Sequence, residues 1–249
     1  MSALLRLENL SKSFGALRVT DDVTLDVAQG ELHAVIGPNG AGKTTLIHQV
    51  SGLVPADGGR ILFGGADVAA LPMAKRVRLG IARSFQITSI LPGFSALENV
   101  ALAIQARSGS SFRILAPAAA EDGLNRPALE LLRRFGLADR APAPAGLLSY
   151  GEKRQLELAV ALATAPKLLL LDEPLAGTSH EESRRVVETL RALKGSLTIL
   201  LVEHDMEAVF ALADRVSVLV YGRVIATGTP AAIRADPAVR AAYLGEEAA

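Results

Sequence analysis

Short apolar runs alternate with helical patterns along most of this chain. Four of the runs are continuously apolar, which is expected of strands that are buried on both faces of a sheet. These runs are Leu32 to Gly37, Leu168 to Asp172, Leu197 to His204 and Arg215 to Val220. Because strands that alternate with helices form a mostly parallel sheet with helices on both faces, the pattern predicts an α/β core.

The pattern changes at two places along the chain. Near the start, the runs LLRLENLSKSF, VTLDV and GRILFGG are separated by turn residues and predict antiparallel strands beside the main sheet. From Phe94 to Ala165 the strand signal is replaced by helical periodicity. We therefore predict one domain over residues 1–249, with an α/β core and a β-subdomain in residues 1–93 and 166–249 and an inserted helical subdomain in residues 94–165.

Composition restricts the chemistry more than the fold. The 26 basic and 26 acidic residues cancel, so the overall charge does not indicate a nucleic-acid partner or an anionic membrane surface. The absence of cysteine excludes disulfides, thiolate metal sites and cysteine nucleophiles. The chain start lacks the features of a secretory signal, and no apolar stretch reaches the ~20 residues that a bilayer span needs. We expect a soluble, cytoplasmic protein without a nucleic-acid partner.

A glycine-rich loop follows the first core strand and matches the Walker A pattern G-x4-G-K-[ST], in the strand-to-helix context that this motif requires. Its glycines let backbone N–H groups surround an anion, the lysine adds a charge toward the β- and γ-phosphates, and the hydroxyl of Thr44 suits Mg²⁺. A chance glycine-rich turn would lack the flanking strand and helix. The predicted nucleotide-binding residues of this loop are Gly37, Pro38, Asn39, Gly40, Ala41, Gly42, Lys43, Thr44 and Thr45.

Two carboxylates end the second core strand, in the sequence KLLLLDEP. The ends of parallel strands are where open α/β sheets present ligand groups. We predict that Asp172 holds Mg²⁺ through water and that Glu173 is the general base that polarises the attacking water. The alternative is a pair of solvated carboxylates that cap the next helix.

The stretch LLSYGEKRQLELAVALA predicts a helix that begins near Ser149, because Ser149 and Glu152 form a capping box ahead of an apolar-periodic run. A helix N-terminus also presents unpaired N–H groups and the positive end of the helix dipole. Gly151 in the first turn would let an anion approach the backbone closely. The same segment is therefore interpreted both as a helix start and as half of a phosphate site.

These motifs, in this order along nearly the whole chain, resemble those of ABC-type ATPases. LSYGE resembles the signature motif, RSFQ the Q-loop and VEHDM the switch-histidine loop, and KSFGALRV contains an aromatic residue where that family stacks one on adenine. The resemblance implies that the chain uses ATP and Mg²⁺ and that it hydrolyses ATP as one of two ATPase subunits. The site residues that it implies are Phe14 and Val19 at adenine, Gln86 beside Thr44 and Asp172 at Mg²⁺, His204 at the γ-phosphate, and Ser149 and Gly151 at the nucleotide of the opposite subunit.

Each of these residues also has a structural alternative. Gln86 is also compatible with a polar strand end, His204 with a hydrogen-bonded core histidine, and Phe14 with a core aromatic. The remaining histidines are expected to be structural or solvated, and these are His33, His48 and His180.

One loop departs from the family pattern. After the Walker B strand the family usually has Leu followed by Asp, Ser or Asn, often with Pro, whereas this chain has LAGTSHEE, with Thr178 in the Leu place and His180 in the Pro place. That loop packs across the dimer in the family, so the departure bears on the rate of hydrolysis and on coupling between sites.

Within the family, the chain resembles the LivG-type ATPases of branched-chain or hydrophobic amino-acid importers. The features that carry this resemblance are IGPNGAGKTT, VEHDM, the tail GTPAAIRADPAVRAAYLGE and the long segment Arg107 to Pro127. The implied partners are membrane permease subunits, a second ATPase subunit that is either identical or LivF-type and, indirectly, a substrate-binding protein outside the membrane. The chain would then lie on the inner face of the membrane, and the apolar residues after the Q-loop would contact the permease or else belong to the core: Ile87, Ile90, Leu91 and Phe94.

Other functions remain open in principle. Importers of urea and other small solutes share much of the same pattern, and a non-transport ABC ATPase is a further alternative. A DNA-repair ABC ATPase would contain a long coiled coil and a translation-type factor would contain two cassettes, and neither feature occurs here. A non-transport P-loop enzyme such as a kinase would lack LSYGE ahead of the Walker B strand.

Overall fold

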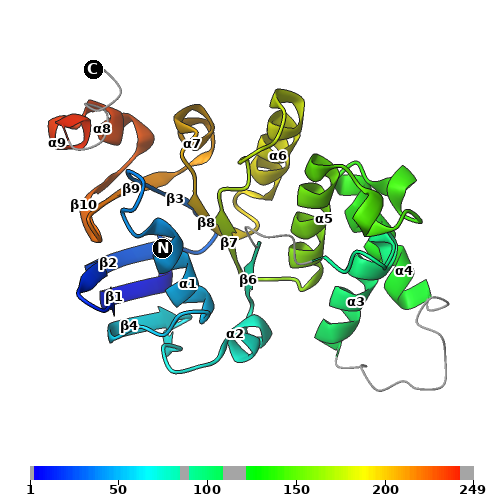
Figure 1. Ribbon diagram of the computed structural model, residues 1–249, viewed down its shortest axis with the longest axis horizontal. Helices are drawn as coiled ribbons and strands as arrows, with labels where there is room; N and C mark the ends of the chain where they lie inside the picture. The colour runs from blue at the N-terminus through cyan, green and yellow to red at the C-terminus, as the bar shows by residue number, and fades with distance from the viewer. Residues whose placement is uncertain (1–2, 85–89, 109–121, 242–249) are drawn as a thin grey trace.

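The computed structural model describes residues 3–84, 90–108 and 122–241, which form two sheets and the helices around them (Figure 1). The strands are β1 (Ala3–Phe14), β2 (Leu17–Ala28), β3 (Leu32–Ile36), β4 (Gly58–Phe63), β5 (Ala66–Asp67), β6 (Ile81–Arg83), β7 (Leu168–Asp172), β8 (Thr198–Val202), β9 (Arg215–Val220) and β10 (Arg223–Gly228). The helices are α1 (Lys43–Ser51), α2 (Met73–Leu79), α3 (Ala96–Ser108), α4 (Asp122–Arg134), α5 (Tyr150–Ala163), α6 (His180–Leu193), α7 (Met206–Leu212), α8 (Pro230–Ala235) and α9 (Pro237–Val239). Two short 3-10 turns, η2 (Ala138–Arg140) and η3 (Ala145–Leu147), precede α5.

The larger sheet has the strand order β10-β9-β3-β8-β7-β6. All neighbours in it are parallel except β10, which pairs antiparallel with β9 at one edge. The α/β prediction is therefore confirmed, but the predicted run to His204 is too long, because the strand ends at Val202. The sequence pattern also missed β6 and β10, since the first has only three residues and the second alternates between half-buried and exposed positions.

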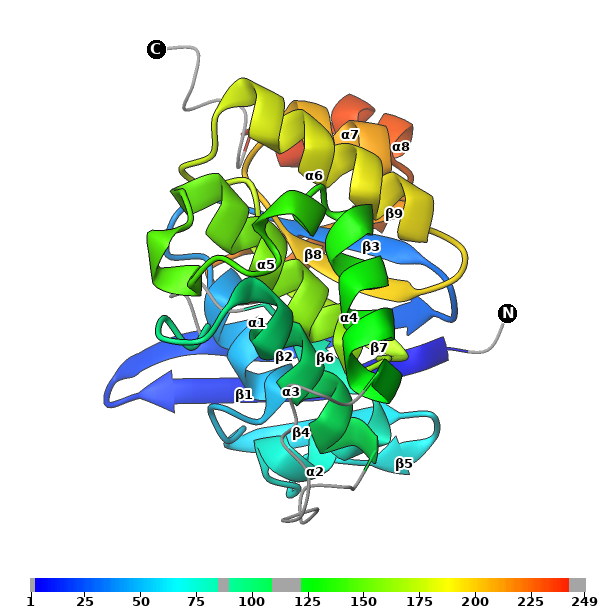
Figure 2. The same cartoon turned by 90° about the vertical axis from the view of Figure 1, so that its right-hand side faces the viewer.

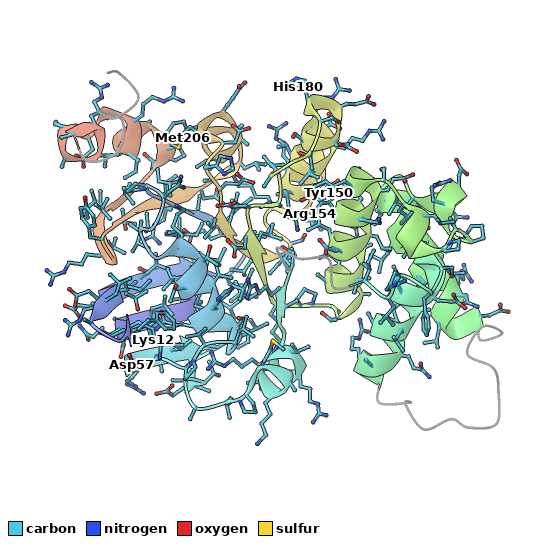
Figure 3. All side chains as sticks on the ribbon, viewed as in Figure 1. Lys12, Asp57, Tyr150, Arg154, His180 and Met206 are labelled. Carbon is cyan, nitrogen blue, oxygen red and sulfur yellow. The ribbon has the colours of Figure 1, made fainter. Side chains whose placement is uncertain are left out.

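The smaller sheet has the order β2-β1-β4-β5 and is antiparallel throughout, as predicted. Its first strand has irregular register with both neighbours and contains Asn9 in a left-handed conformation. The ammonium of Lys12 on this strand lies 2.6 Å from the carboxylate of Asp57, which precedes β4 (Figure 3). This ion pair fixes the far end of the β1–β2 hairpin to the turn before β4.

The larger sheet separates two hydrophobic clusters. Along β3, β7 and β8 successive side chains enter opposite clusters, so that Leu169 and Leu171 face one while Leu168 and Leu170 face the other. One cluster contains side chains of α3 to α7, and the other contains those of α1 and the antiparallel sheet. Figures 1 and 2 show these layers on the two faces of the sheet. Burial on both faces is the reason that these strands read as continuous apolar runs.

A buried arginine fixes the helix after the glycine-rich loop to the rest of the molecule. The guanidinium of Arg76 on α2 donates to the carbonyls of Gln49 and Val50 at 2.7 and 2.8 Å, and also to those of Leu71 and Ala69. Because Gln49 and Val50 lie in the last turn of α1, the cation stands at the negative end of that helix dipole.

Between Ala96 and Ala163 the described elements are helical. Helices α3, α4 and α5 pack on one another at one end of the molecule, with α5 between the larger sheet and the other two (Figure 1). Among the described residues, none of the helices combines the length and the apolar character needed to cross a membrane.

Candidate active site

The glycine-rich loop follows β3 and is held by two close backbone contacts that only glycine permits. A Cβ on Gly37 would stand 2.0 Å from the carbonyl oxygen of Leu219, and one on Gly42 would stand 2.3 Å from that of Val19. Both glycines have positive φ angles, 154° and 103°. Gly42 is also the N-cap of α1. Because glycine has no side chain, no side-chain hydrogen bond satisfies the N–H groups at the start of this helix. Such a helix start is suited to bind an anion.

Lys43 stands in the first turn of α1 and is buried. Its Nζ donates to the carbonyl oxygens of Gly37 at 2.7 Å and Pro38 at 3.0 Å, so the ammonium lies against the loop itself. Burial lowers the pKa of Lys43, and the carboxylates of Glu173 and Asp172 act in the opposite direction. The loop therefore holds a partly desolvated cation, which would attract a polyphosphate strongly, while the two acids nearby would favour a divalent cation beside it.

Asp172 ends β7 without any exposure to solvent. One of its oxygens accepts from the Thr44 hydroxyl at 3.3 Å, and the other lies 3.3 Å from the guanidinium of Arg83. Burial raises the pKa of Asp172, and the charge of Arg83 lowers it in part.

A hydroxyl and a carboxylate at this distance are the hard oxygen ligands that Mg²⁺ prefers. The described residues contain no group of three or more acids or histidines that could enclose a metal ion. Because Mg²⁺ usually keeps several water molecules and binds protein through one or two carboxylates, the Thr44–Asp172 pair fits that ion.

Glu173 has a positive φ angle of 48°, a left-handed conformation that costs a non-glycine residue about 1–2 kcal/mol. Its N–H donates to the carbonyl of Val202 at 2.8 Å, and its own carbonyl lies 3.4 Å from the guanidinium of Arg154. Among the described residues, no hydrogen bond or ion pair engages its carboxylate. The backbone is thus fixed while the carboxylate is available to accept a proton.

Helix α5 begins as the sequence predicted. Ser149 is its N-cap, and the capping box with Glu152 is complete, with bonds of 3.2 and 2.8 Å. Gly151, however, is buried, and a Cβ on it would stand 1.7 Å from the carboxylate of Glu182 on α6. The space that this glycine leaves is therefore filled by α6 of the same chain and is not open for an anion to approach from that side.

The start of α5 also contacts the loop that follows Glu173. The hydroxyl of Tyr150 lies 3.4 Å from the carbonyl oxygen of Ala176, and its ring packs against Gly177. Arg154, one turn later, lies 6.0 Å from the same ring (Figure 3). Two residues of α5 thus face the segment that carries Glu173.

Glu203 is a residue of this site that the sequence analysis missed. It is almost fully buried and accepts backbone N–H groups of Leu175 at 2.8 Å, His204 at 2.9 Å and Asp205 at 3.4 Å. Burial raises the pKa of Glu203, and these three donors lower it in part. The signal was available, because an acid interrupts an otherwise apolar run just after β8. The carboxylate joins the loop after Glu173 to the loop that contains His204.

The other predicted site residues differ in their surroundings. Val19 packs directly against Gly42. Phe14 is 51% exposed at the tip of the β1–β2 hairpin, where the ammonium of Lys12 lies 5.4 Å from its ring, so it is not a core aromatic. Gln86 lies outside the described residues.

The four histidines differ in their burial and in their partners. His204 has a side chain that is 59% exposed and lies 3.7 Å from Glu203, which excludes a core histidine. His33 is fully buried between Glu31 and Ser217, at 2.9 Å from each. His48 is half-buried, and His180 is exposed at the start of α6.

Comparison with known proteins agrees with this geometry. Residues 20–176 match the profile described as ABC transporter, and residues 223–249 match that of the branched-chain amino acid ATP-binding cassette transporter. The chain belongs to the ABC transporter family. It is an ABC ATPase. Enzymes of this family bind and hydrolyse ATP.

Relatives that are equally identical to this chain are named for different transport systems. The chain is 37% identical over 251 residues to the high-affinity branched-chain amino acid transport ATP-binding protein LivG of Salmonella typhimurium, with 98% of each chain covered. It is also 37% identical over 248 residues to the lipopolysaccharide export ATP-binding protein LptB of Escherichia coli, again with 98% of each covered. Among solved structures, the ADP conformation of the ABC transporter cassette MJ1267 superposes with a TM-score of 0.85 at 30% identity, covering 98% of this chain and 100% of that one.

We predict that the ammonium of Lys43 is needed for nucleotide binding by this ABC ATPase. Charge-assisted hydrogen bonds of this kind contribute about 1.5–3 kcal/mol each, so Lys43→Ala should weaken MgATP binding at least tenfold in titration calorimetry. Thr44→Ala should weaken the Mg²⁺-dependent part of the affinity. Lys75→Ala, at an exposed position of α2, is the matched control. Unchanged affinity in Lys43→Ala would contradict the assignment.

We further predict that Glu203 keeps the two loops in place. In Glu203→Gln the amide N–H₂ must face a backbone N–H, so at least one of the hydrogen bonds between the two loops is lost. Turnover should fall by roughly tenfold, and the free energy of unfolding should fall by about 1–3 kcal/mol. MgATP affinity should change by less than about twofold, because Glu203 does not touch the glycine-rich loop. Glu207→Gln, exposed on α7, should leave all three quantities unaltered. Normal steady-state turnover in Glu203→Gln would show that the loops do not depend on this carboxylate.

Proposed function

We propose that this chain powers an importer of branched-chain or other hydrophobic amino acids. The observation that carries the proposal is the match of residues 223–249 to the branched-chain amino acid cassette profile. It favours a LivG-like role over a role in lipopolysaccharide export, although LivG and LptB are equally identical to the chain overall. An importer of urea or another small solute is the next candidate, ahead of a non-transport role.

The proposed chemistry uses the groups around the glycine-rich loop. The loop from Gly37 to Thr45 would bind the phosphates, and Thr44 and Asp172 would hold Mg²⁺, which would offset the charge of the phosphates. Glu173 accepts a proton from the attacking water, and its fixed backbone keeps the carboxylate aimed while charge develops. His204 contacts the γ-phosphate, Phe14 and Val19 pack on adenine, and Gln86 completes the Mg²⁺ site.

We also propose that two ATPase subunits form each complete site. Among the described residues, no hydrogen bond or ion pair joins the start of α5 to the glycine-rich loop: Ser149 bonds to Glu152, and Lys43 bonds to its own loop. A second chain, identical or LivF-like, supplies Ser149 and Gly151 to the nucleotide. Because Glu182 fills the space beside Gly151, phosphate reaches this helix end from the side of the Ser149 cap.

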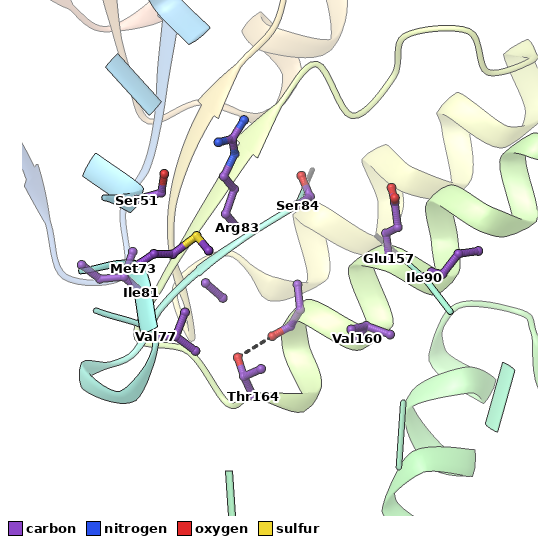
Figure 4. Close-up of a pocket in the computed structure, with 12 residues that line it drawn as sticks. Ser51, Met73, Val77, Ile81, Arg83, Ser84, Ile90, Glu157, Val160 and Thr164 are labelled. Carbon is purple, nitrogen blue, oxygen red and sulfur yellow. Dashed lines mark hydrogen bonds between the residues drawn. The ribbon is translucent and has the colours of Figure 1, made fainter. Parts of the chain in front are cut away.

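The permease contact is proposed at a cavity of about 310 Å³ between α2, β6 and α5. Its wall is largely apolar and includes Met73, Val77, Ile90 and Val160 (Figure 4). Ile90 is half-buried and packs on the core, whereas Leu91 and Phe94 next to it are 41% and 45% exposed. An apolar segment of a permease subunit fits this space. Ile87 lies outside the described residues. Through the permease, the chain is held at the inner face of the membrane and serves a substrate-binding protein outside it.

The permease proposal is tested by co-purification with the membrane subunits. Ile90→Asp and Leu91→Asp should abolish recovery of the permease, because either places a charge against an apolar segment. Ile225→Asp, an exposed apolar position on β10 at the opposite edge of the larger sheet from β6, is the matched control and should retain the permease. Thermal unfolding within about 3 °C of the wild type would show that the fold is intact. A large loss of stability in Leu91→Asp as well as Ile90→Asp would instead favour a core role for these residues.

The substrate is tested with the co-purified complex in proteoliposomes. ATP-dependent uptake of radiolabelled leucine, isoleucine or valine should exceed uptake of urea by at least tenfold when the matching binding protein is added. Urea uptake without leucine uptake would contradict the amino-acid proposal and leave the ATPase assignment intact.

The two-subunit proposal is tested by size-exclusion chromatography with light scattering. Glu173→Gln should bind ATP without cleaving it, since the amide cannot accept the proton, and with MgATP and partner subunit it should elute as a dimer. Adding Ser149→Arg should return it to monomer. Adding Ser149→Asp is more selective, because Asp is a good N-cap but repels phosphate, so it too should give monomer without loss of the helix. A dimer that survives both changes, or turnover by a monomer, would contradict the proposal.

A further inference from the structure

A second hollow, of about 660 Å³, adjoins the cavity proposed for the permease. Val77 on α2 and Thr164 after α5 line both spaces, so a segment seated in the cavity can continue into the hollow. In Figure 4 these two residues stand at the end of the cavity away from Ser84 and Glu157. Ala103, Ala106 and Arg107, from the C-terminal part of α3, also line the hollow.

Three cations line this hollow, and none of the other described residues in its lining is a carboxylate. They are Arg78 on α2, Arg107 on α3 and Lys167 before β7, and all three are exposed. Lys167 is fixed next to the end of α2, because its N–H donates to the carbonyl of Gly80 at 2.8 Å. We call this space the basic hollow, after these three residues. In the part of the chain that the structure describes, none of their side chains forms an ion pair or hydrogen bond.

Some other cations at the surface are paired with acids, whereas others, such as Arg126 and Arg191, have no acidic partner among the described residues. Arg18 and Arg223 both pair with Asp21, at 2.8 and 2.6 Å, and the half-buried Arg215 pairs with Asp26 at 3.1 Å. Arg78 and Arg107 lie in the last turns of their helices, where the helix dipole favours a cation. The dipole does not account for Lys167, which is not on a helix, or for the convergence of all three on one concavity.

Most of the other residues that line the basic hollow are apolar. Val77 and Leu79 on α2 are 40% and 42% exposed, and four alanines line it as well, at positions 74, 103, 106 and 165, beside Gly80 and Thr164. Exposed apolar side chains next to three cations are complementary to an amphipathic segment that carries acids along its edge.

We propose that the basic hollow binds an acidic segment of the permease, continuous with the apolar part that occupies the neighbouring cavity. The proposal rests on the proposed permease contact and adds the charge of the partner to it. The apolar cavity supplies burial, while the cations select a partner of opposite charge and fix the direction in which its segment lies.

The test compares two triple variants on the permease complex held in nanodiscs. One combines Arg78→Gln, Arg107→Gln and Lys167→Gln. The matched control combines Arg126→Gln, Arg134→Gln and Arg191→Gln, which removes three exposed cations of α4 and α6 that also form no ion pair among the described residues. Thermal unfolding and MgATP affinity are measured for both to establish equal folding.

At 50 mM NaCl the first variant should bind the permease about tenfold more weakly than the wild type, and the control within about twofold. Raising NaCl to 500 mM shortens the screening length, so wild-type binding should weaken severalfold while the first variant hardly changes. Equal binding by the two variants would overturn the acidic-segment proposal alone. Binding of the wild type to empty nanodiscs with anionic lipid, lost in the first variant, would overturn it in favour of a membrane surface. Failure of the wild type to bind the permease at all would overturn the proposed function as well.

Discussion

The buried carboxylate of Asp172 constrains the arrangement of the whole site. It stands at the end of a strand whose other side chains are apolar and buried, where an uncompensated charge would be strongly destabilising. Compensation comes from the hydroxyl of Thr44 on α1 and the guanidinium of Arg83 on β6, with Lys43 nearby. Helix α1, β6 and β7 must therefore keep their relative positions. The site for an anion and a divalent cation thus lies where three elements meet.

The segment after Asp172 connects this constraint to the helices beyond the sheet. The N–H of Glu173 is bonded to β8, its carbonyl faces Arg154 on α5, and two residues later Leu175 is bonded to Glu203. The left-handed conformation of Glu173 persists because neighbours on both sides fix the backbone. A shift of α5 relative to the sheet would therefore move the backbone of Glu173.

The loop that departs from the family pattern has its own internal support. Thr178 donates to the carbonyl of Leu175 and bonds to Ser183, at 2.8 and 2.7 Å, so a hydroxyl closes the turn at this position. Ser179 then caps α6 in a second complete capping box, with Glu182, and the same Glu182 fills the space left by Gly151. The starts of α5 and α6 are thus packed together, and an alanine at position 151 would displace a capping carboxylate.

The sequence by itself determined the parts that depend on neighbours along the chain. The continuous runs of β3, β7 and β8, the strand-loop-helix of Gly37 to Lys43 and the Ser149 capping box all follow from local spacing, and the structure contains them. What only the tertiary structure decided depends on residues far apart: Arg76 capping α1, Glu203 joining two loops, Glu182 beside Gly151 and the cations around the basic hollow. A buried polar side chain is recognised by the partners that compensate its desolvation, and those partners come from other elements. The local sequence pattern does not show which residues from other elements become these partners, so the pairings are known only from the folded chain.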